Sequence, residues 1–446
     1  MIGPFPWDPF PPSGEPDPKG PDPVHAIAFR AAVTSADAYR SVRIGLRRES
    51  GTLRVGNRFV TDGRYRQVAF LSFGNAANSM ALGALHAVGD RLTQGFLAGP
   101  EPVASEIPFR GVQVAPGWGG AGEAGSVVAA AEELARGLSE QDLLVILLSG
   151  GASRSLTQPP KGMTGDEFGR LLETAFASGA TGAEVSLLGR VLGTGAVGGR
   201  LAGMIPAADT ATLVVDRGDG ARLLGGGPMH PVAPSERTQC HDLLTRLGLL
   251  SSLPPGAQAM LGNSPTPAAF PDRIARPVVV AGPGDALKAA ADSVFDKGWT
   301  SRLAFLALHD APVPAAQRFL ARSDALYVAE GITSDSRTKG VGAFAMTTLG
   351  LPEGVEDGPS FGEFVTTAQG GLRRREMSAG LFRTAGAVGA REFPAGAVVG
   401  ASTDPEANVR PDRARVVAMR AGVTDVGMLA VALYPTPGGG KKPGRR

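Results

Sequence analysis

The sequence DLLVILLSGGASRSL, residues 142–156, is the stretch that decides the fold. Its six consecutive apolar residues, Leu143–Leu148, are typical of a strand buried on both faces of a parallel sheet. The run ends in Ser149, Gly150 and Gly151, a polar loop at the strand's carboxyl end, where open α/β sheets bind their ligands. The stretch therefore predicts both a central strand and the loop beside which a ligand is expected to bind.

Strands and helices alternate outward from this strand in both directions. RQVAFLSFG (66–74) predicts a strand that ends in glycine and opens a helix, and TLVVD (212–216) predicts another strand downstream. A further strand, turn and helix are predicted in the same order over residues 277–299, PVVVAGPGDALKAAADSVFDKGW. The alternation predicts an α/β fold with a doubly wound, mostly parallel, Rossmann-like sheet. The remaining elements that apolar spacing predicts are helices over 25–48, 126–138 and 165–178, and short strands over 95–98, 111–115, 325–329, 397–400 and 429–433.

Proline-rich stretches divide the chain into two predicted domains. The N-terminal domain carries the doubly wound sheet, and a smaller α/β domain follows a linker that is rich in proline. The predicted boundaries are a flexible leader at 1–24, the N-terminal domain at 25–250, the linker at 251–276, the C-terminal domain at 277–436 and a flexible tail at 437–446.

The composition excludes several classes of protein. The net charge is +2 and no basic stripe interleaves with aromatic residues, which argues against nucleic-acid binding. Cys240 is the single cysteine, so a disulfide framework and a cysteine-rich metal site are both ruled out. The longest apolar runs are too short to span a membrane, and residues 1–22 do not resemble a signal peptide. We therefore expect a cytoplasmic protein that binds neither nucleic acid nor membrane, with a homo-oligomer or a protein partner left open.

The loop after the central strand has the composition of a small-anion site. Gly150 and Gly151 carry no side chain that would keep backbone N–H groups away from an anion. Ser149 and Ser153 add hydroxyl groups, and Arg154 adds a full positive charge. The alternative is a tight turn that binds nothing, and the pattern by itself does not choose between the two.

Other glycine-rich segments carry weaker signals. GAGEAG (120–125) and GTGAVG (193–198) match the dinucleotide-binding pattern, but such matches arise by chance in a chain with 63 glycines. The first match also lacks a suitable acid at the end of the following strand, so NAD binding is not expected. In GDGARLLGGGP (218–228), Asp219 is suited either to hold Mg²⁺ or, more simply, to cap a turn.

Taken in chain order, several segments resemble the glycerate 2-kinase family, whose members carry a C-terminal MOFRL domain. The resemblance runs from about residue 25 to about residue 435. The segments that carry it are YRQVAFLSFGNAANSM (65–80), DLLVILLSGGASRSLTQPPKGMT (142–164), SGATGAE (178–184), GGRLA (198–202), LVVDRGDGARLLGGGP (213–228), STDPEA (402–407) and AGVTDVGMLAVAL (421–433). The resemblance implies transfer of the γ-phosphoryl group of ATP to glycerate in a cleft between the two domains, with Mg²⁺.

Several positions at which the family carries a catalytic or charged side chain are replaced here. The lysine of the family's GKAA segment is Asn75, and the lysine of KGGRLA is Val197. The aspartate of its SDV segment is Val215, and the arginine of GxGGRNQE falls on Ala343. Loss of several cations from a phosphoryl-transfer site is expected to lower the rate by many orders of magnitude.

The positions that survive are consistent with two main hypotheses about function. The first is a pseudoenzyme that binds a small anion or a partner protein at Ser149–Arg154, without ATP or Mg²⁺. The second is an active ATP- and Mg²⁺-dependent kinase for glycerate or another hydroxy acid, in which Arg154 or Arg217 replaces a lost cation; a different enzyme reusing the cleft is also left open. The resemblance places Asp219, Glu330 and Asp404 in a nucleotide or metal cleft.

Overall fold

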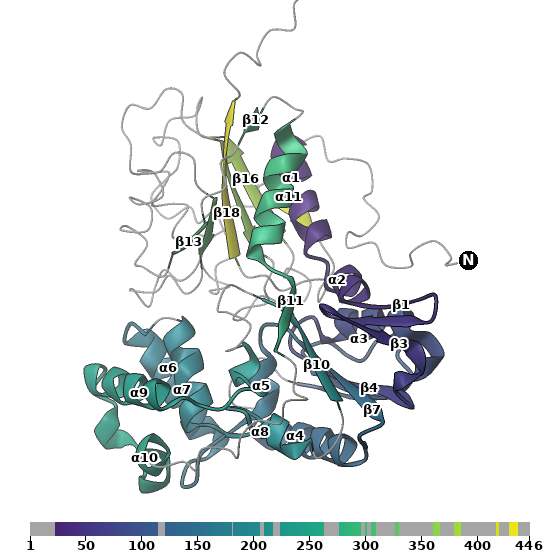
Figure 1. Ribbon diagram of the computed structural model, residues 1–446. Helices are drawn as coiled ribbons and strands as arrows, with labels where there is room; N and C mark the ends of the chain where they lie inside the picture. Colours follow the sequence, from purple (N-terminus) through teal and green to yellow (C-terminus); the bar gives the residue numbers. More distant parts are fainter. Residues whose placement is uncertain are drawn as a thin grey trace, which may run out of the picture. The chain divides into compact units, whose positions relative to one another are not determined.

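The computed structural model describes residues 23–114, 121–180, 182–205, 209–216, 224–262 and 276–295, together with the later strands β12 to β18 (Figure 1). The chain forms two compact units. One comprises Ala38–Ala281, and the other comprises Met1–Asp37 with Gly282–Arg446. The candidate site lies in the first unit.

A six-stranded parallel sheet forms the centre of the first unit. Its spatial order is β11-β10-β7-β4-β5-β6, and every neighbouring pair is parallel. All seven residues of β7 are buried, as the apolar run predicts for a strand covered on both faces. The predicted doubly wound fold is thus confirmed. The strands are β4 Gln67–Phe73, β5 Leu92–Gly99, β6 Arg110–Gln113, β7 Asp142–Leu148, β10 Asp209–Val215 and β11 Val278–Ala281.

Helices cover both faces of this sheet. One face packs against α2 (Ala38–Gly45) and α3 (Ala77–Val88). The other face packs against α4 (Ala121–Arg136), α5 (Ala152–Leu156) and α8 (Arg200–Met204) in one apolar cluster. Four further helices gather beside the sheet around a second apolar cluster (Figure 1). They are α6 Gly165–Ala177, α7 Gly182–Leu192, α9 Pro234–Arg246 and α10 Pro255–Gly262.

The predicted helix over 25–48 is wrong in its second half. The stretch predicted as one helix forms two helices, α1 (Pro23–Ser35) and α2, and α2 ends at Gly45. Leu46 then begins a three-stranded antiparallel sheet, in which Ser50 (φ +47°) and Gly51 (φ +77°) make the first turn. Two consecutive residues with positive φ favour a hairpin, so turn geometry overrides the helical spacing here. The strands are β1 Leu46–Glu49, β2 Thr52–Val55 and β3 Arg58–Thr61.

The short elements of this unit are mostly connections that the sequence patterns did not indicate. They are η1 Asp62–Arg64, η2 Gly89–Arg91, β8 Thr157–Gln158, β9 Thr194–Gly195, η3 Leu224–Gly226 and η4 Leu250–Ser252. Strands β8 and β9 pair with each other in a separate two-stranded sheet.

The second unit contains α1 packed against α11 (Pro283–Phe295) and a mostly antiparallel sheet. The order of that sheet is β13-β14-β18-β15-β16-β17, with β12 pairing to β18. Strand β14 confirms the strand predicted at 325–329, and β18 confirms the one predicted at 429–433; the strand predicted at 397–400 lies outside the described residues. The strands are β12 Trp299–Thr300, β13 Phe305–Leu308, β14 Leu326–Ala329, β15 Ser360–Val365, β16 Ala379–Thr384, β17 Val416–Ala418 and β18 Met428–Pro435.

The division between the units falls at other residues than the sequence suggests. Helix α1 belongs with the second unit because it packs on α11. Strand β11, expected to open the C-terminal domain, pairs with β10 and completes the first sheet. Helix α10 lies within the stretch expected to be a linker and packs on α7 and α9. Strand pairing and helix packing therefore decide these boundaries, and proline content does not.

None of the helices in the described part of the chain is both long enough and apolar enough to cross a bilayer.

Candidate functional site

The order of the parallel strands identifies one point at which a ligand is expected. From β4 the chain adds β5 and β6 on one side, then returns to place β7 on the other side and continues to β10 and β11. The direction therefore reverses between β4 and β7, and open α/β sheets bind ligands outside the carboxyl ends of strands at such a switch point. The two loops that leave β4 and β7 begin at Gly74 and at Ser149.

Backbone hydrogen bonds join these two loops tightly. Ser149 N–H donates to the Phe73 carbonyl (3.0 Å), and Asn75 N–H donates to the Gly150 carbonyl (2.8 Å). Gly74 is required at the crossing because its φ is +114° and an added Cβ would lie 2.5 Å from the Ser149 carbonyl oxygen. The loops after β4 and β7 therefore form one continuous surface.

The Ser149 side chain supports this surface from the interior of the protein. The side chain is fully buried, and its hydroxyl oxygen accepts the Ala76 N–H at 2.9 Å. The hydroxyl also donates to the Phe73 carbonyl at 3.4 Å. With both functions used inside the protein, the Ser149 hydroxyl holds the end of β7 to the start of α3.

The half-buried part of the loop carries the groups that a ligand is able to reach. Arg154 Nη2 donates to Asn75 Oδ1 at 3.0 Å, so the guanidinium lies beside the position at which the resembled family carries lysine. Gly151 adjoins this pair: its φ is +80°, and an added Cβ would lie 2.6 Å from Arg154 Nη2. Ser153 is half-buried beside them. The structure thus brings Asn75, Gly151, Ser153 and Arg154 together.

Of the two loop glycines, Gly151 is half-buried and Gly150 is buried. Within the part of the chain that the structure describes, neither Gly150 nor Gly151 donates a backbone hydrogen bond. Two such N–H groups next to a guanidinium form a concentrated set of donors, which is suited to an anion.

The other predicted positions are buried or undescribed. Val197 and Val215 are fully buried, and Val197 packs against Gly226, where an added Cβ would lie 2.6 Å from Val197 Cγ1. Asp216, one residue beyond Val215, is half-buried at the carboxyl end of β10 and donates its N–H to the Ala281 carbonyl at 2.8 Å. The positions outside the described residues are Arg217, Asp219, Glu330, Ala343 and Asp404.

The described residues contain no cluster of metal ligands: no three His, Cys, Asp or Glu side chains among them come together in a way that would hold a metal ion. Cys240 is buried, and burial raises the pKa of its thiol to about 12, which keeps it protonated.

Sequence analysis missed two side chains that hold the loops at this end of the sheet. Asn78 accepts the Ala104 N–H at 3.1 Å and donates to the Pro102 carbonyl at 2.8 Å, which fixes the loop after β5. Arg190 is 1% exposed and donates to the carbonyls of Gly226 and Gly227 at 3.2 and 3.1 Å. An arginine within the apolar run LLGRVL (187–192) was the available signal for the second.

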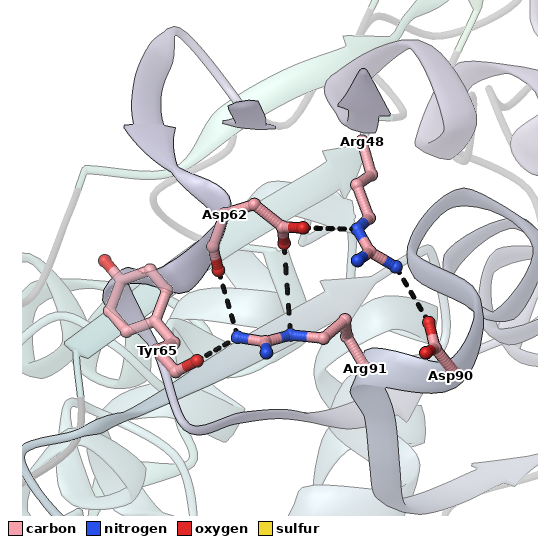
Figure 2. Close-up of polar contacts among 5 residues, drawn as sticks. All are labelled: Arg48, Asp62, Tyr65, Asp90 and Arg91. Atoms are coloured by element: carbon pink, nitrogen blue, oxygen red, sulfur yellow. Dashed lines mark hydrogen bonds and ion pairs between the residues drawn. The ribbon is translucent and has the colours of Figure 1, made fainter. Parts of the chain in front are cut away.

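A separate network of charges lies at the opposite end of the strands. Figure 2 shows Arg48 between Asp62 and Asp90, with Nε and Nη1 donating at 2.6 and 2.7 Å. Arg91 donates to the backbone carbonyls of Asp62 and Tyr65, which precede β4. The hydrogen bond to Asp62 raises the pKa of the Arg48 guanidinium. These charges satisfy one another, so the network stabilises the loops before β4 and β5.

Comparison with known proteins adds a family match and a shared fold. Residues 25–262 match the family described as "Domain of unknown function (DUF4147)". Human glycerate kinase is 30% identical over 216 residues, which are 45% of this chain and 41% of the human protein. A putative hydroxypyruvate reductase of Agrobacterium vitis is 34% identical over 132 residues, which are 29% of this chain and 33% of that protein. The aligned part is thus less than half of either relative.

A likeness in structure extends over most of the chain. The crystal structure of a glycerate kinase from Thermotoga maritima matches with a TM-score of 0.63 at 17% identity. The match covers 92% of this chain and 98% of that one. At this identity the likeness shows a common fold.

Proposed function

Since the chain belongs to the glycerate kinase family, whose DUF4147 domain covers more than half of its residues, we propose that it binds a small anion at the switch-point loop and has lost ordinary kinase turnover. One observation carries this proposal. Arg154 lies 3.0 Å from Asn75 at the carboxyl ends of β4 and β7, and this contact puts a cation beside the donors of Gly150 and Gly151.

The donors present are sufficient for modest affinity. A hydrogen bond to a charged group contributes about 1.5–3 kcal/mol, so two or three such bonds support dissociation constants in about the micromolar to millimolar range. Carboxylate and phosphate oxygens both accept such bonds, and Arg154 is able to bind either of them in a bidentate manner.

The proposed loss of turnover follows from how few cations remain in reach of a phosphoryl group. Asn75 is neutral, and Val197 is fully buried. Arg200 donates to the carbonyls of Gly193 and Val197, at 3.0 and 3.1 Å, and Arg190 is likewise bonded to carbonyls. Burial, with nearby Arg237, also lowers the pKa of Arg200. Phosphoryl transfer relies on cations clamped around the transferred oxygens, and within the described part of the chain the half-buried Arg154 alone is a weak replacement for them.

A coupled assay of ADP release with glycerate, ATP and Mg²⁺ tests the loss of turnover. The expected result is no release above the background of ATP hydrolysis. Turnover of about one per second, within the ordinary range for enzymes, would overturn that part of the proposal.

Calorimetry with phosphate and with glycerate tests anion binding separately. The Arg154→Ala variant is expected to raise the dissociation constant at least about tenfold, because it removes a charge-assisted hydrogen bond. Arg246→Ala is the matched control, since Arg246 is an exposed arginine paired with Glu184 at 2.6 Å and distant in sequence from the loop. Equal binding by parent and Arg154→Ala would remove Arg154 from the site, and no binding by the parent would leave the loop as scaffold.

An active kinase is the second candidate function, and the same contact favours it. The guanidinium of Arg154 contacts Asn75, which stands where the family carries a lysine. Arg154 therefore places a cation next to that position, from the loop after β7. ADP release that is present in the parent and lost in Arg154→Ala would select this candidate over the first.

The resemblance to the family also supports proposals about the cofactors and about the identity of the second unit. ATP and Mg²⁺ are required only if turnover is retained, and Asp216 is then one described oxygen donor at this end of the sheet. We assign the second unit to a MOFRL domain on the resemblance of the segments 402–407 and 421–433 to those of the family. We place the protein in the cytoplasm, which a single buried thiol fits.

A further inference from the structure

Arg190 is a buried cation that the proposed chemistry does not use. It lies on α7, is 1% exposed, and is among the largest fully buried side chains of the described residues. Its Nη1 donates to the carbonyls of Gly226 and Gly227, and its Nη2 donates to the Pro231 carbonyl at 2.7 Å. Glu236, at the start of α9, supplies the counter-charge, with Oε1 3.3 Å from Arg190 Nε. Both Nη atoms of the guanidinium are therefore hydrogen-bonded inside the protein, and its charge is paired with Glu236.

The carbonyls that Arg190 binds are shared with a second segment. The Gly226 carbonyl also accepts the Gly198 N–H, and the Gly227 carbonyl accepts the Gly199 N–H, both at 2.9 Å. Glu236 in turn accepts the Ala233 N–H at 2.6 Å through Oε2. One side chain thus joins the turn after β9, the segment 224–231 and the first turn of α9.

These segments pack directly on the helix that carries the anion loop. Gly225 has φ +65°, and an added Cβ would lie 3.1 Å from Ala152 Cβ and 3.7 Å from Leu148 Cδ2. Ala196 donates its N–H to the Leu156 carbonyl at 2.9 Å, at the other end of the same helix. Ala152 follows Gly151, and Leu156 ends α5. The residues that contact the two ends of this helix are close in sequence to the shared carbonyl network: Gly225 precedes Gly226, and Ala196 lies two positions before Gly198.

From this chain of contacts we propose that Arg190 is a positioning residue for the switch-point loop. It fixes the segment 224–231, and this segment supports Ala152 and thereby the placement of Gly151 and Arg154, without Arg190 touching anything bound there. The link to ligand affinity rests on the anion binding proposed above, whereas the link to the order of the loop does not.

Arginine suits this role because its planar fork presents several donors at fixed angles. A lysine at the same position keeps the charge opposite Glu236 but is unable to reach three carbonyls in a fixed plane. Arg190→Lys therefore weakens the geometry while preserving the buried charge, which makes it a milder change than removal of the cation.

Hydrogen exchange on the full chain tests the coupling to the loop. In Arg190→Lys we expect the amides of 149–156 to exchange at least about tenfold faster than in the parent, although the carbonyls and the carboxylate bonded by Arg190 belong to 226–236. The peptides of β4 and β5 are expected to exchange at the parental rate. The control is Arg237→Lys, which alters a half-buried arginine on α9 that donates to the Met260 carbonyl at 3.1 Å, away from the loop. Faster exchange confined to 224–231, with 149–156 unchanged, would overturn the proposal.

A second variant covers the case in which Arg190→Lys does not fold. Glu236→Gln retains the arginine and removes its counter-charge, and we expect faster exchange at 149–156 here too, by a smaller factor. Unchanged exchange at 149–156 in this variant would count against the proposal in the same way.

Calorimetry with phosphate and glycerate then separates the two proposals. Where the parent binds, Arg190→Lys is expected to raise the dissociation constant about tenfold and Arg237→Lys to leave it unchanged. Equal affinity of the parent and Arg190→Lys would show that the residue is structural alone. Where the parent binds neither anion, the proposed function fails, and the exchange of 149–156 still decides whether Arg190 orders the loop.

Discussion

The two ends of the six-stranded sheet are stabilised in different ways. At the amino ends of the strands, opposite charges pair: Arg66 Nη2 lies 2.8 Å from Asp142 Oδ2, and Arg64 Nη2 lies 3.0 Å from Asp209 Oδ2. At the carboxyl ends, the loops after β4 and β7 meet through backbone atoms, and Arg154 bonds an amide oxygen. At the amino ends the charges pair with one another, whereas at the carboxyl ends Arg154 bonds the neutral side chain of Asn75.

This difference shows that the two ends of one sheet are held by different kinds of contact. Ion pairs with a fully buried carboxylate such as Asp142 hold the amino ends, whereas the carboxyl ends depend on close approach of glycine-containing backbone. A substitution is therefore expected to act through electrostatics at the first end and through steric contact at the second.

The largest effect is expected from Gly74→Ala at the carboxyl ends. The added methyl group would lie 2.5 Å from two oxygen atoms of Ser149, at a φ of +114°. Overpacking and backbone strain each cost about 1–3 kcal/mol, so we expect a loss of about 4 kcal/mol and a fall in Tm of about 10 °C. Gly63→Ala is the control, because nothing lies within 4 Å of its added Cβ. A fall of less than about 2 °C for Gly74→Ala would show that the loops have room to separate.

Asp142→Asn tests the electrostatic end. Asp142 accepts hydrogen bonds from Arg66, at 3.0 and 2.8 Å, and from the N–H and hydroxyl of Ser139, both at 2.8 Å. Asn keeps one acceptor and loses the charge, so urea unfolding at pH 7 is expected to show a loss of about 2 kcal/mol. The exposed Asp90 serves as the control residue, and Asp90→Asn is expected to unfold like the parent.

The pH dependence of the same carboxyl group gives an independent check. Burial opposes its ionisation, but the hydrogen bonds from Arg66 and Ser139 hold the pKa of Asp142 below its ordinary value of 3.8. A lowered native pKa stabilises the fold above about pH 4, and that stabilisation is lost as the pH falls through the native pKa. The difference in stability between parent and Asp142→Asn should therefore narrow below about pH 4; a constant difference would exclude this carboxyl as its source.

Tyr65→Phe is expected to have a smaller effect at the same end. The Tyr65 hydroxyl donates to Asp209 Oδ2 at 2.9 Å, and its loss should cost about 1 kcal/mol. Burial, together with Asp209, raises the pKa of Tyr65 above its ordinary value of 10. A raised pKa favours the protonated form in the fold, so the contribution is present below about pH 10 and is lost as the pH rises. Unfolding followed from pH 8 to 11 should show the parent losing stability that Tyr65→Phe retains.

The smallest effect on stability is expected from Arg154→Gln. Gln is still able to bond Asn75, so Tm should change by less than about 2 °C, while affinity for phosphate or glycerate falls about tenfold. The matched change at the other end is Arg66→Gln, which leaves the buried Asp142 short of two charged donors and should lower Tm more. A larger loss of stability for Arg154→Gln than for Arg66→Gln would contradict the comparison between the two ends.

Local patterns were sufficient to predict most of the six-stranded sheet but not the separate three-stranded sheet β1–β3. The run Leu143–Leu148 is apolar throughout, and such runs leave few alternatives to a buried strand. The β1–β3 sheet was missed because Ser50 and Gly51 decide it through two positive φ angles, and the spacing of apolar residues before them reads as helical.

The sequence was sufficient to predict which residues make up the candidate site. It was not sufficient to predict which of them support the loop from inside and which lie where a ligand is able to reach them. Ser149 and Ser153 are equivalent in the sequence, yet the first is fully buried under the loop and the second is half-buried beside Arg154. The pairing of Arg154 with Asn75, 79 positions apart, depends on β4 and β7 becoming neighbours. Arg190 was overlooked because its partners are backbone carbonyls, which every residue carries and no pattern marks.

By itself, the sequence determined that the chain alternates strands and helices, that the strand after Asp142 is central, and that a glycine-rich loop with an arginine ends it. Short-range propensity and periodicity contain that information, because they act between residues close in the chain. Only the tertiary structure decided that β7 lies beside β4. The switch point, the Arg154–Asn75 contact and the hydrogen bonds of Arg190 to the carbonyls of 226–231 all depend on the tertiary arrangement. These features depend on which strands pair, and pairing is settled by burial and hydrogen bonding between segments that are remote in sequence.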